Sequence, residues 1–273
     1  MTQILNVVFY TILTKRCKLL SGIKLPKIIK IEFVKLINLH TKIMLRLYHQ
    51  QNNSYEICID EVGRGCLFGR TYIAAVVLAK DGSFDGTQIK DSKKFSSKKK
   101  IKTVSEYIKQ NCLYYHIASV ENDIVDKINI LQAVMQGMHE CISTLIQEIN
   151  ADTGTKNDFL AIIDGNYFKP YTYFDDESNC IVELPHITVE KGDATYMGIA
   201  AASILAKVAR DEYIGALCEK YPLLKEQYQL HTNMGYGTKA HLEGIQKHGI
   251  TNLHRTSFRG TQSNLPRTQI ENI

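Results

Sequence analysis

Four carboxylates stand where buried strands or a long helix are expected to end or begin. Asp60 and Glu61 directly follow one apolar run, Asp164 follows a second, and Asp193 stands just before a long helical pattern. Carboxylates at the ends of such strands face the crevice in which α/β sheets bind ligands. An oxygen-rich set without Cys or His suits Mg²⁺ or Mn²⁺. Two such ions about 4 Å apart activate a water and stabilise the leaving oxygen of a phosphodiester. The acids therefore indicate metal-assisted phosphodiester hydrolysis.

Each acid taken alone also fits ordinary turn chemistry. Asp164 begins an Asp-Gly-Asn turn sequence, and the pair Asp60-Glu61 fits a simple strand end. A cluster of all four, however, would repel itself unless cations occupied it, and this favours a metal site. Because adjacent strand residues point to opposite faces, Asp60 and Glu61 share a site only if the strand breaks there, which Gly63 permits. Otherwise Glu61 contributes mainly its backbone carbonyl.

The elements that must position these acids follow from periodicity and turn residues. Alternating and continuous apolar runs predict strands at 55–60, 71–79, 113–119, 159–163 and 187–189. Apolar spacings of three and four predict helices from a Ser96 or Ser97 cap to about 110, from Asn129 to about 149, at 196–219, and at 238–248 before Gly249. Strands first, then alternating helices and strands, predict an α/β protein: a mixed sheet flanked by helices, with a helical C-terminal part.

Composition narrows the class of protein. The hydrophobic fraction of 44% and the charged fraction of 22% are those of a soluble globular chain. No apolar run reaches the length of a membrane span. Seven cysteines form no C-x-x-C pair and no zinc-like cluster with histidine, so we expect a reduced, cytoplasmic protein without disulfides or zinc.

Charge is concentrated at the N-terminus. Residues 1–50 carry nine Lys and Arg against one Glu, whereas residues 51–273 carry 24 basic and 27 acidic residues. The Ile/Lys-rich extension 1–50 has three interpretations: a targeting peptide, a peripheral basic arm, or a start assigned too early, with Met44 as the true start. We favour the last. Residues 51–260 are then the main domain and 261–273 a tail, which we expect to be disordered.

Six segments in order make the chain resemble the ribonuclease HII family, from Tyr55 to Phe258. They are IDEVGRG at 59–65, DSKK at 91–94, DG at 164–165, KGD at 191–193 with AAASILAKVARD at 200–211, GYGT at 235–238 with His241, and HRTSF at 254–258. Each motif alone is weak, but six in order are specific. The resemblance covers most of the chain and leaves out the first 50 residues.

The resemblance implies an RNase H-like core with Asp60, Glu61, Asp164 and Asp193 as catalytic metal ligands for Mg²⁺ or Mn²⁺. It implies a monomeric endonuclease that cuts the RNA strand of RNA–DNA hybrids and DNA carrying embedded ribonucleotides, leaving a 3′-hydroxyl and a 5′-phosphate. The substrate-binding residues that it implies are Gly63, Arg64 and Gly65 at the ribose 2′-hydroxyl, Tyr236 stacked beside them, and Lys93 at a phosphate.

Some features depart from the family pattern or stay ambiguous. The segment 66–70 (CLFGR) replaces the usual small residues and prolines, and 167–180 is a longer acidic and aromatic insertion without a functional explanation. Asp211 is expected to be structural. His254 and Arg255 are either structural anchors or contacts to the substrate backbone, and His241 fits packing better than catalysis.

Two alternative functions stay open on the sequence. One is a ribonuclease HIII-like hybrid nuclease without single-ribonucleotide activity, although the short, irregular extension argues against its extra domain. The other is a non-catalytic hybrid-binding protein, which the intact acids oppose.

Overall fold

A computed structural model describes residues 45–52 and 54–273. Residues 1–44 of the predicted extension 1–50 lie outside the described residues, so the three interpretations of the extension stay predictions. Residues 45–50 lie against the domain that follows. Arg46 exchanges two main-chain hydrogen bonds of 2.8 Å with Thr195 and Met197. The backbone N–H groups of His49 and Gln50 donate to the buried carboxylate of Glu56.

A five-stranded mixed sheet forms the centre of the molecule, in the order β3-β2-β1-β4-β7. Its strands are β1 (Tyr55–Val62), β2 (Thr71–Val77), β3 (Tyr114–Val120), β4 (Phe159–Asp164) and β7 (His186–Val189). β1, β2 and β3 form an antiparallel meander, whereas β4 pairs parallel to β1 and β7 parallel to β4. All five predicted strands are confirmed, with ends that differ by one or two residues.

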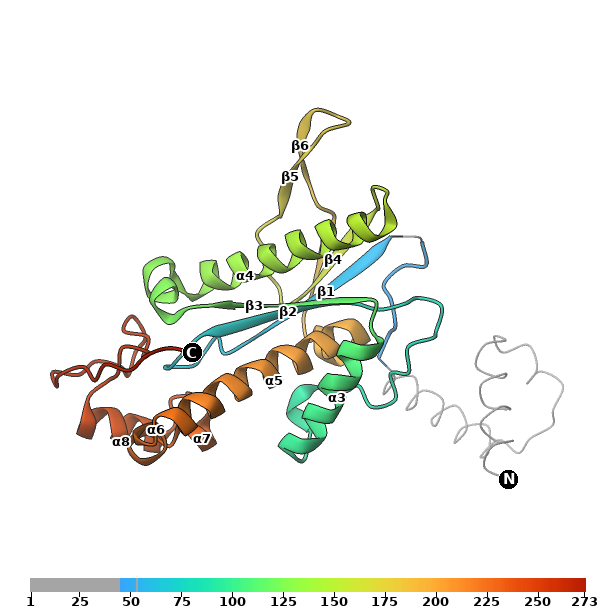
Figure 1. Cartoon of the computed structure of the whole chain (residues 1–273). Helices are drawn as coiled ribbons and strands as arrows, with labels where there is room; N and C mark the ends of the chain where they lie inside the picture. The colour runs from blue at the N-terminus through green and yellow to red at the C-terminus, as the bar shows by residue number, and fades with distance from the viewer. Residues whose placement is uncertain (1–44, 53) are drawn as a thin grey trace, which may run out of the picture. The chain divides into compact units, whose positions relative to one another are not determined.

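One helical layer covers each face of the sheet (Figure 1). α4 (Asn122–Thr153) lies on one face, while α5 (Met197–Lys220) and α3 (Lys98–Asn111) lie on the other. The core against α4 holds the odd residues Ile57 and Ile59 of β1, and the opposite core holds alternate residues of β2 such as Ala74. The predicted mixed sheet flanked by helices is therefore confirmed.

Two helix boundaries show what local sequence determines. Ser97, one of the two predicted caps, accepts a hydrogen bond from the Lys100 N–H at the start of α3. α4 begins at Asn122, seven residues before the predicted start. Asn129 interrupts it with φ of 66°, and its side chain accepts from the N–H groups of Leu131 and Gln132. Asn129 is therefore the cap of the predicted helix, and the turns before it were missed.

The C-terminal part is helical, as predicted, and ends on the domain. α6 (Leu223–Tyr228), α7 (Leu230–Asn233) and α8 (Lys239–His248) follow α5. The prediction of a disordered tail is wrong for its last residues: Ile270 is buried, Asn252 and Ile270 exchange two hydrogen bonds, and Tyr213 donates to Asn272. Within the described part of the chain, no helix combines the length and apolarity needed to cross a membrane.

The acidic and aromatic insertion contains a β-hairpin that the sequence analysis missed. β5 (Thr172–Asp175) and β6 (Cys180–Glu183) pair only with each other and project past α4 (Figure 1). Its outward cross-strand pair, Phe174 and Ile181, is exposed.

A helix–strand contact near the sheet centre depends on glycine. A Cβ on Gly198 of α5 would lie 2.5 Å from Sγ and 2.8 Å from Cβ of Cys58 in β1. Because Cys58 lies two residues before Asp60, this approach brings α5 against the strand that carries the first acid.

We expect Gly198→Ala to lower the free energy of unfolding by about 1–3 kcal/mol, because an extra methyl group overpacks a filled core. Gly215→Ala is the matched control on the same helix, since a methyl group at that position would have no neighbour within 4 Å. It should stabilise by about 0.5–1 kcal/mol through helix propensity. Urea denaturation measures both. Equal effects of the two substitutions would contradict the close α5–β1 contact.

Candidate active site

Asp60 and Asp164 lie on one face of the sheet, at one edge of two adjacent parallel strands. Ile59 pairs with Ile163 in the β1–β4 register, so the next residues, the two aspartates, lie side by side. Cross-strand partners share a face, and Asp60 is opposite Ala74, a residue of the core under α5. The two carboxylates therefore face α5.

Asp60 is a buried acid with like charges around it. Burial raises the pKa of Asp60 well above its ordinary value, and the charges of Asp164 and Glu61 raise that pKa further. Hydrogen bonds from Ser203 of α5 and from the Glu61 N–H oppose this increase. A buried carboxyl without a cationic partner is costly to ionise, so this site favours either a proton or a cation.

Asp164 is held by the segment that carries the fourth acid. Its Oδ1 accepts from the Gly192 N–H at 2.6 Å, and a Cβ on Gly192 would approach that oxygen to 3.0 Å. Asp193 lies in the single turn Gly192–Ala194, just before α5. Burial raises the pKa of Asp164 and the Asp193 charge adds to it, whereas Lys93 lowers it. Asp60, Asp164 and Asp193 thus meet at one edge, with Lys93 nearby.

Glu61 lies on the other face of the sheet. The strand does not break after Asp60: β1 continues to Val62, and Glu61 pairs with Ile73, whose side chain packs under α4. The Glu61 carboxylate forms an ion pair of 3.5 Å with Arg64. Burial raises the pKa of Glu61, Arg64 lowers it, and the Asp164 charge raises it. Asp60 and Glu61 could share a site through their side chains only if the strand broke between them, and it does not. This favours a contribution of Glu61 through its backbone carbonyl.

These donors suit a hard divalent cation in chemistry and charge. Three carboxylates at one edge supply only oxygen ligands. Burial raises the pKa of both Asp60 and Asp164, and neighbouring negative charges, those of Asp164 and Glu61 for Asp60 and that of Asp193 for Asp164, raise it further. Within residues 45–52 and 54–273, however, no three His, Cys, Asp or Glu side chains converge closely enough to hold an ion as they stand. The fit therefore rests on negative charge that a cation would neutralise.

Ser92 and Ser203 join the Lys-rich motif to the acids. The buried Ser92 hydroxyl lies 3.0 Å from the buried Ser203 hydroxyl, and Ser203 in turn lowers the pKa of Asp60. This fixes the short turn Ser92–Lys94 beside the carboxylates and leaves Lys93 exposed. Sequence reasoning missed both serines, although each stands inside a quoted motif.

The turn Gly63-Arg64-Gly65 is anchored from below by Arg255. The buried guanidinium donates to the carbonyls of Gly63 (2.7 Å), Arg64 (3.2 Å) and Gly69 (3.0 Å). Carbonyls turned inward leave the opposite side of these peptides available to a ligand. A Cβ on Gly65 would meet nothing within 4 Å, so the fold does not require glycine there.

Arg210 is a second buried anchor. It donates to the carbonyls of Met234 (2.6 Å), Phe68 (3.0 Å) and Arg70 (3.3 Å), and a Cβ on Gly63, with φ of 94°, would lie 2.3 Å from its Nε. The segment 66–70 is buried from Cys66 to Gly69, so its departure from the family pattern is accommodated inside the protein.

Tyr236 lies beside this turn with its side chain 45% exposed. Its backbone forms an isolated antiparallel bridge with Cys66. The structure thus brings together Tyr236 and the Gly63–Gly65 turn, as the predicted substrate surface requires.

The remaining charged and ionisable candidates have structural partners. Asp211 forms an ion pair with Lys207 one helical turn earlier, which agrees with the structural role expected of it. His254 and Arg255 are both buried, so the alternative of direct substrate contact is wrong and they are anchors. His241 is also buried and packs as expected.

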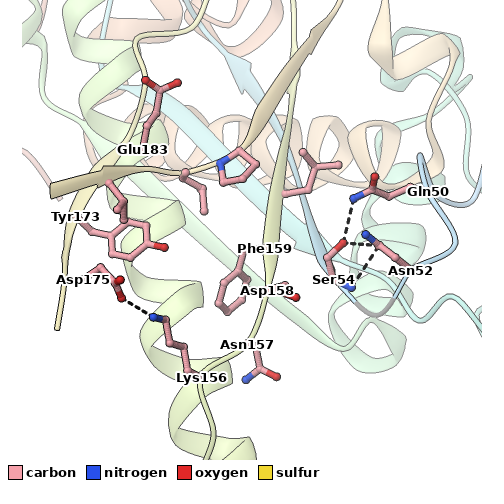
Figure 2. A pocket seen from close by; sticks show the side chains of 14 residues that line it. Gln50, Asn52, Ser54, Lys156, Asn157, Asp158, Phe159, Tyr173, Asp175 and Glu183 are labelled. Atoms are coloured by element: carbon pink, nitrogen blue, oxygen red, sulfur yellow. Dashed lines mark hydrogen bonds and ion pairs between the residues drawn. The ribbon is translucent and has the colours of Figure 1, made fainter. Parts of the chain in front are cut away.

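A cavity of about 470 Å³ lies away from the acids, between the β5–β6 hairpin and the starts of β1 and β4 (Figure 2). Polar side chains line it, and Lys156 forms an ion pair with Asp175 across it. Its residues include Ser54 and Phe159, which lie at the opposite ends of β1 and β4 from Asp60 and Asp164. The acids do not line this cavity.

Solved structures share this fold. Ribonuclease H2 from Pyrococcus horikoshii OT3 matches with a TM-score of 0.55 and 20% identity, covering 76% of this chain and 95% of that one. The Bst-RNase HIII structure in complex with Mn²⁺ also has a TM-score of 0.55, with 16% identity, and covers 78% and 70% of the two chains. The fold is that of the ribonuclease H2 and HIII structures.

Sequence comparison identifies the family. Residues 57–261 match the sequence model of ribonuclease HII. The ribonuclease HII of Alkaliphilus oremlandii is 41% identical over 209 residues, which are 76% of this chain and 92% of that protein. That of Parabacteroides distasonis is 39% identical, over 78% of this chain and 94% of that protein. The chain therefore belongs to the ribonuclease HII family and is an enzyme with ribonuclease H activity. The non-catalytic alternative is excluded.

Because the pKa of Asp60 is raised, we expect Asp60→Asn to be more stable than the wild type when no divalent metal is present, and the difference should grow with pH. The folded carboxyl binds its proton more tightly than the unfolded one, so wild-type stability falls as pH rises from about 4 through the folded pKa. Asn does not titrate, and its advantage should grow across that window to about 1–3 kcal/mol. Urea denaturation in EDTA at several pH values measures it. An Asn variant less stable than wild type near about pH 8 would refute the electrostatic description.

Proposed function

We propose that this enzyme is a metal-dependent endonuclease that cuts the RNA strand of RNA–DNA hybrids and incises DNA 5′ to embedded ribonucleotides. Its products would carry 3′-hydroxyl and 5′-phosphate ends. The observation that carries the proposal is the side-by-side position of Asp60 and Asp164 near the carboxyl ends of two parallel strands, with Asp193 beside them. Family membership supports the reaction class.

The side chains of Asp60, Asp164 and Asp193 would hold Mg²⁺ or Mn²⁺, with Glu61 contributing through its backbone carbonyl. The Mn²⁺ complex of Bst-RNase HIII supports this choice of metal by analogy of fold. When bound, such ions activate a water and stabilise the leaving oxygen. Ser203 and the Gly192 N–H orient the Asp60 and Asp164 carboxylates, and the exposed Lys93 is placed to bind a phosphate.

Substrate recognition falls to the Gly63–Gly65 turn and Tyr236. A protein distinguishes RNA from DNA at one position through the ribose 2′-hydroxyl. Arg255 binds the carbonyl oxygens of Gly63 and Arg64 from inside the protein. The backbone at Arg64 and Gly65 is exposed, and it would contact that hydroxyl. The ring of Tyr236, which is half exposed, would stack on the deoxy side of the junction.

We further propose that the enzyme acts as a cytoplasmic monomer without a membrane partner. Free thiols support the reducing compartment: the six cysteines that the structure describes are all unpaired. A structure from Archaeoglobus fulgidus is of a PCNA:RNase HII complex, with a TM-score of 0.55 and 23% identity. The chain here lacks the aromatic pair of a clamp-binding peptide near residues 262–265, and we propose no clamp partner.

Asp164→Asn should lower cleavage of an RNA–DNA hybrid by more than about a hundredfold while the protein stays folded, because one anionic metal ligand is lost. Cleavage rates with Mg²⁺ or Mn²⁺, and circular dichroism of the variant, measure this. Asp211→Asn is the control, because that carboxylate is ion-paired with Lys207. It should keep most activity. An Asp164→Asn enzyme with more than a few per cent of the wild-type rate would rule out the metal assignment.

Tyr236→Ala should reduce cleavage at a single embedded ribonucleotide far more than cleavage of a long hybrid. Stacking is worth about 1–3 kcal/mol per base, and a long hybrid offers many alternative registers. kcat/KM on both duplexes measures the split, with an all-DNA duplex as the uncut control. Gly65→Val should impair both substrates, because a side chain would occupy the open space at the turn.

Wild-type enzyme that degrades long hybrids but ignores the single ribonucleotide would support the ribonuclease HIII-like alternative. The metal-site proposal would survive that result, since it does not depend on the junction.

A further inference from the structure

Two buried histidines form a hydrogen-bonded pair beneath the Tyr236 loop. His241 Nε2 lies 3.1 Å from His254 Nε2, and both side chains are at most 1% exposed. His241 Nδ1 lies 2.9 Å from the Tyr236 carbonyl oxygen. At the other end, the Thr251 N–H donates to His254 Nδ1 at 2.9 Å. A continuous path of hydrogen bonds therefore joins Thr251 to Tyr236.

The two ends of this path determine the tautomer of each ring. The Thr251 N–H is an obligate donor, so His254 Nδ1 accepts and the ring proton of neutral His254 is on Nε2. The Tyr236 carbonyl is an obligate acceptor, so His241 carries its proton on Nδ1 and accepts at Nε2. Both assignments agree at the central contact, where His254 donates to His241. Every bond in the path is satisfied in the neutral state and in one direction only.

The surroundings keep both rings neutral. Burial lowers the pKa of His254 to about 3, and the His241 and Arg267 charges lower it further. Burial also lowers the pKa of His241. The rings pack against Tyr228 and, for His254, edge-on against Phe68. This is a permanent structural connection over the neutral pH range.

The residue after His254 anchors the other half of the substrate surface. Arg255 holds the carbonyls of Gly63 and Arg64, while His254 acts through His241 on Tyr236. We infer that His241 is a positioning residue that sets the Tyr236 ring relative to the Gly63–Gly65 turn through its Nδ1–H, and that His254 fixes the His241 tautomer that supplies this donor. The pair thereby determines selectivity for the ribonucleotide–deoxyribonucleotide junction. The inference rests on the junction-reading role proposed for Tyr236.

Two substitutions at His241 separate positioning from packing. In His241→Asn the amide nitrogen takes the place of Nδ1 and still donates to the Tyr236 carbonyl, but the His254 N–H loses its acceptor. In His241→Gln the longer side chain reaches the place of Nε2 and accepts from His254, but the bond to Tyr236 is lost. That carbonyl keeps the Thr238 N–H as a donor. An unsatisfied buried donor costs more than a carbonyl reduced to one bond, so His241→Asn should be the less stable variant.

The expected selectivity has the opposite order. His241→Gln should lower the ratio of kcat/KM for a single embedded ribonucleotide to that for a long hybrid by about tenfold, because a small displacement of a binding group is costly. The loss should appear mainly in KM for the single-ribonucleotide duplex. His241→Asn should keep the ratio within about twofold of wild type, although it melts at a lower temperature.

Fluorescence gives a readout independent of activity. The chain has no tryptophan, so Tyr236→Trp introduces a single reporter at the loop. In that background, His241→Gln should lower the steady-state anisotropy and increase acrylamide quenching, and His241→Asn should not. If His241→Gln does not fold, two His254 variants test the tautomer. His254→Asn no longer donates to His241 Nε2 and should lower the substrate ratio, whereas His254→Gln still donates and should keep it.

The outcomes are distinct. If Tyr236→Ala lowers the substrate ratio but His241→Gln leaves it unchanged, the inference is overturned and the proposed function still stands. Equal loss of the ratio in His241→Asn and His241→Gln would also overturn it, because packing alone would then explain the effect. An unchanged ratio in Tyr236→Ala would instead refute the proposed role of Tyr236 itself.

Discussion

The parallel pairing of β1 with β4 is the constraint on which the site depends. One register, Ile59 opposite Ile163, puts an aspartate of each strand side by side on the same face, near the carboxyl ends of both strands. A shift by one residue would send Asp164 toward α4, because side chains alternate along a strand. The apolar residue before each acid, Ile59 and Ile163, is buried in the core under α4, so this burial turns both aspartates to the opposite face. The like charges are thus a consequence of hydrophobic packing, and the raised pKa of Asp60 is its electrostatic cost.

The substrate surface is built on another principle. The turn at 63–65 and the loop around Tyr236 have few ladder hydrogen bonds to hold them, so buried cationic side chains bind their carbonyls. Arg210 and Arg255 together donate to six backbone oxygens and, within the described residues, form no salt bridge. Burial lowers the pKa of Arg255 to about 10, so it stays charged at neutral pH. These positive charges lie under a surface proposed to bind a polyanion, which favours the same function.

The two regions meet in α5 and in the segment 251–255. α5 carries Ser203 beside Asp60 and Arg210 beneath the Gly63 turn, and the consecutive residues His254 and Arg255 extend to Tyr236 and to the turn. Metal ligands and junction contacts are therefore fixed to the same rigid elements. Such rigidity matters because hydrolysis requires the scissile phosphate to be held in line with the activated water. The β5–β6 hairpin and its cavity lie outside this arrangement, at the opposite ends of the strands.

Local sequence by itself determined the strands, the Ser97 cap, the main helices and the family, because apolar periodicity and motif order are properties of neighbouring residues. It also placed Asp164 and Asp193 at element ends. It predicted that the first strand ends at Asp60, whereas β1 continues for two more residues. Only the tertiary structure decided the rest. The face of Glu61 depends on whether β1 continues, which pairing with Ile73 settles. The hairpin in 172–183 pairs only with itself, and its mixed acidic and aromatic sequence carries no clear period. The roles of Ser203 and Arg255 arise from partners 111 and 192 positions away, and no local pattern encodes contacts at such separations.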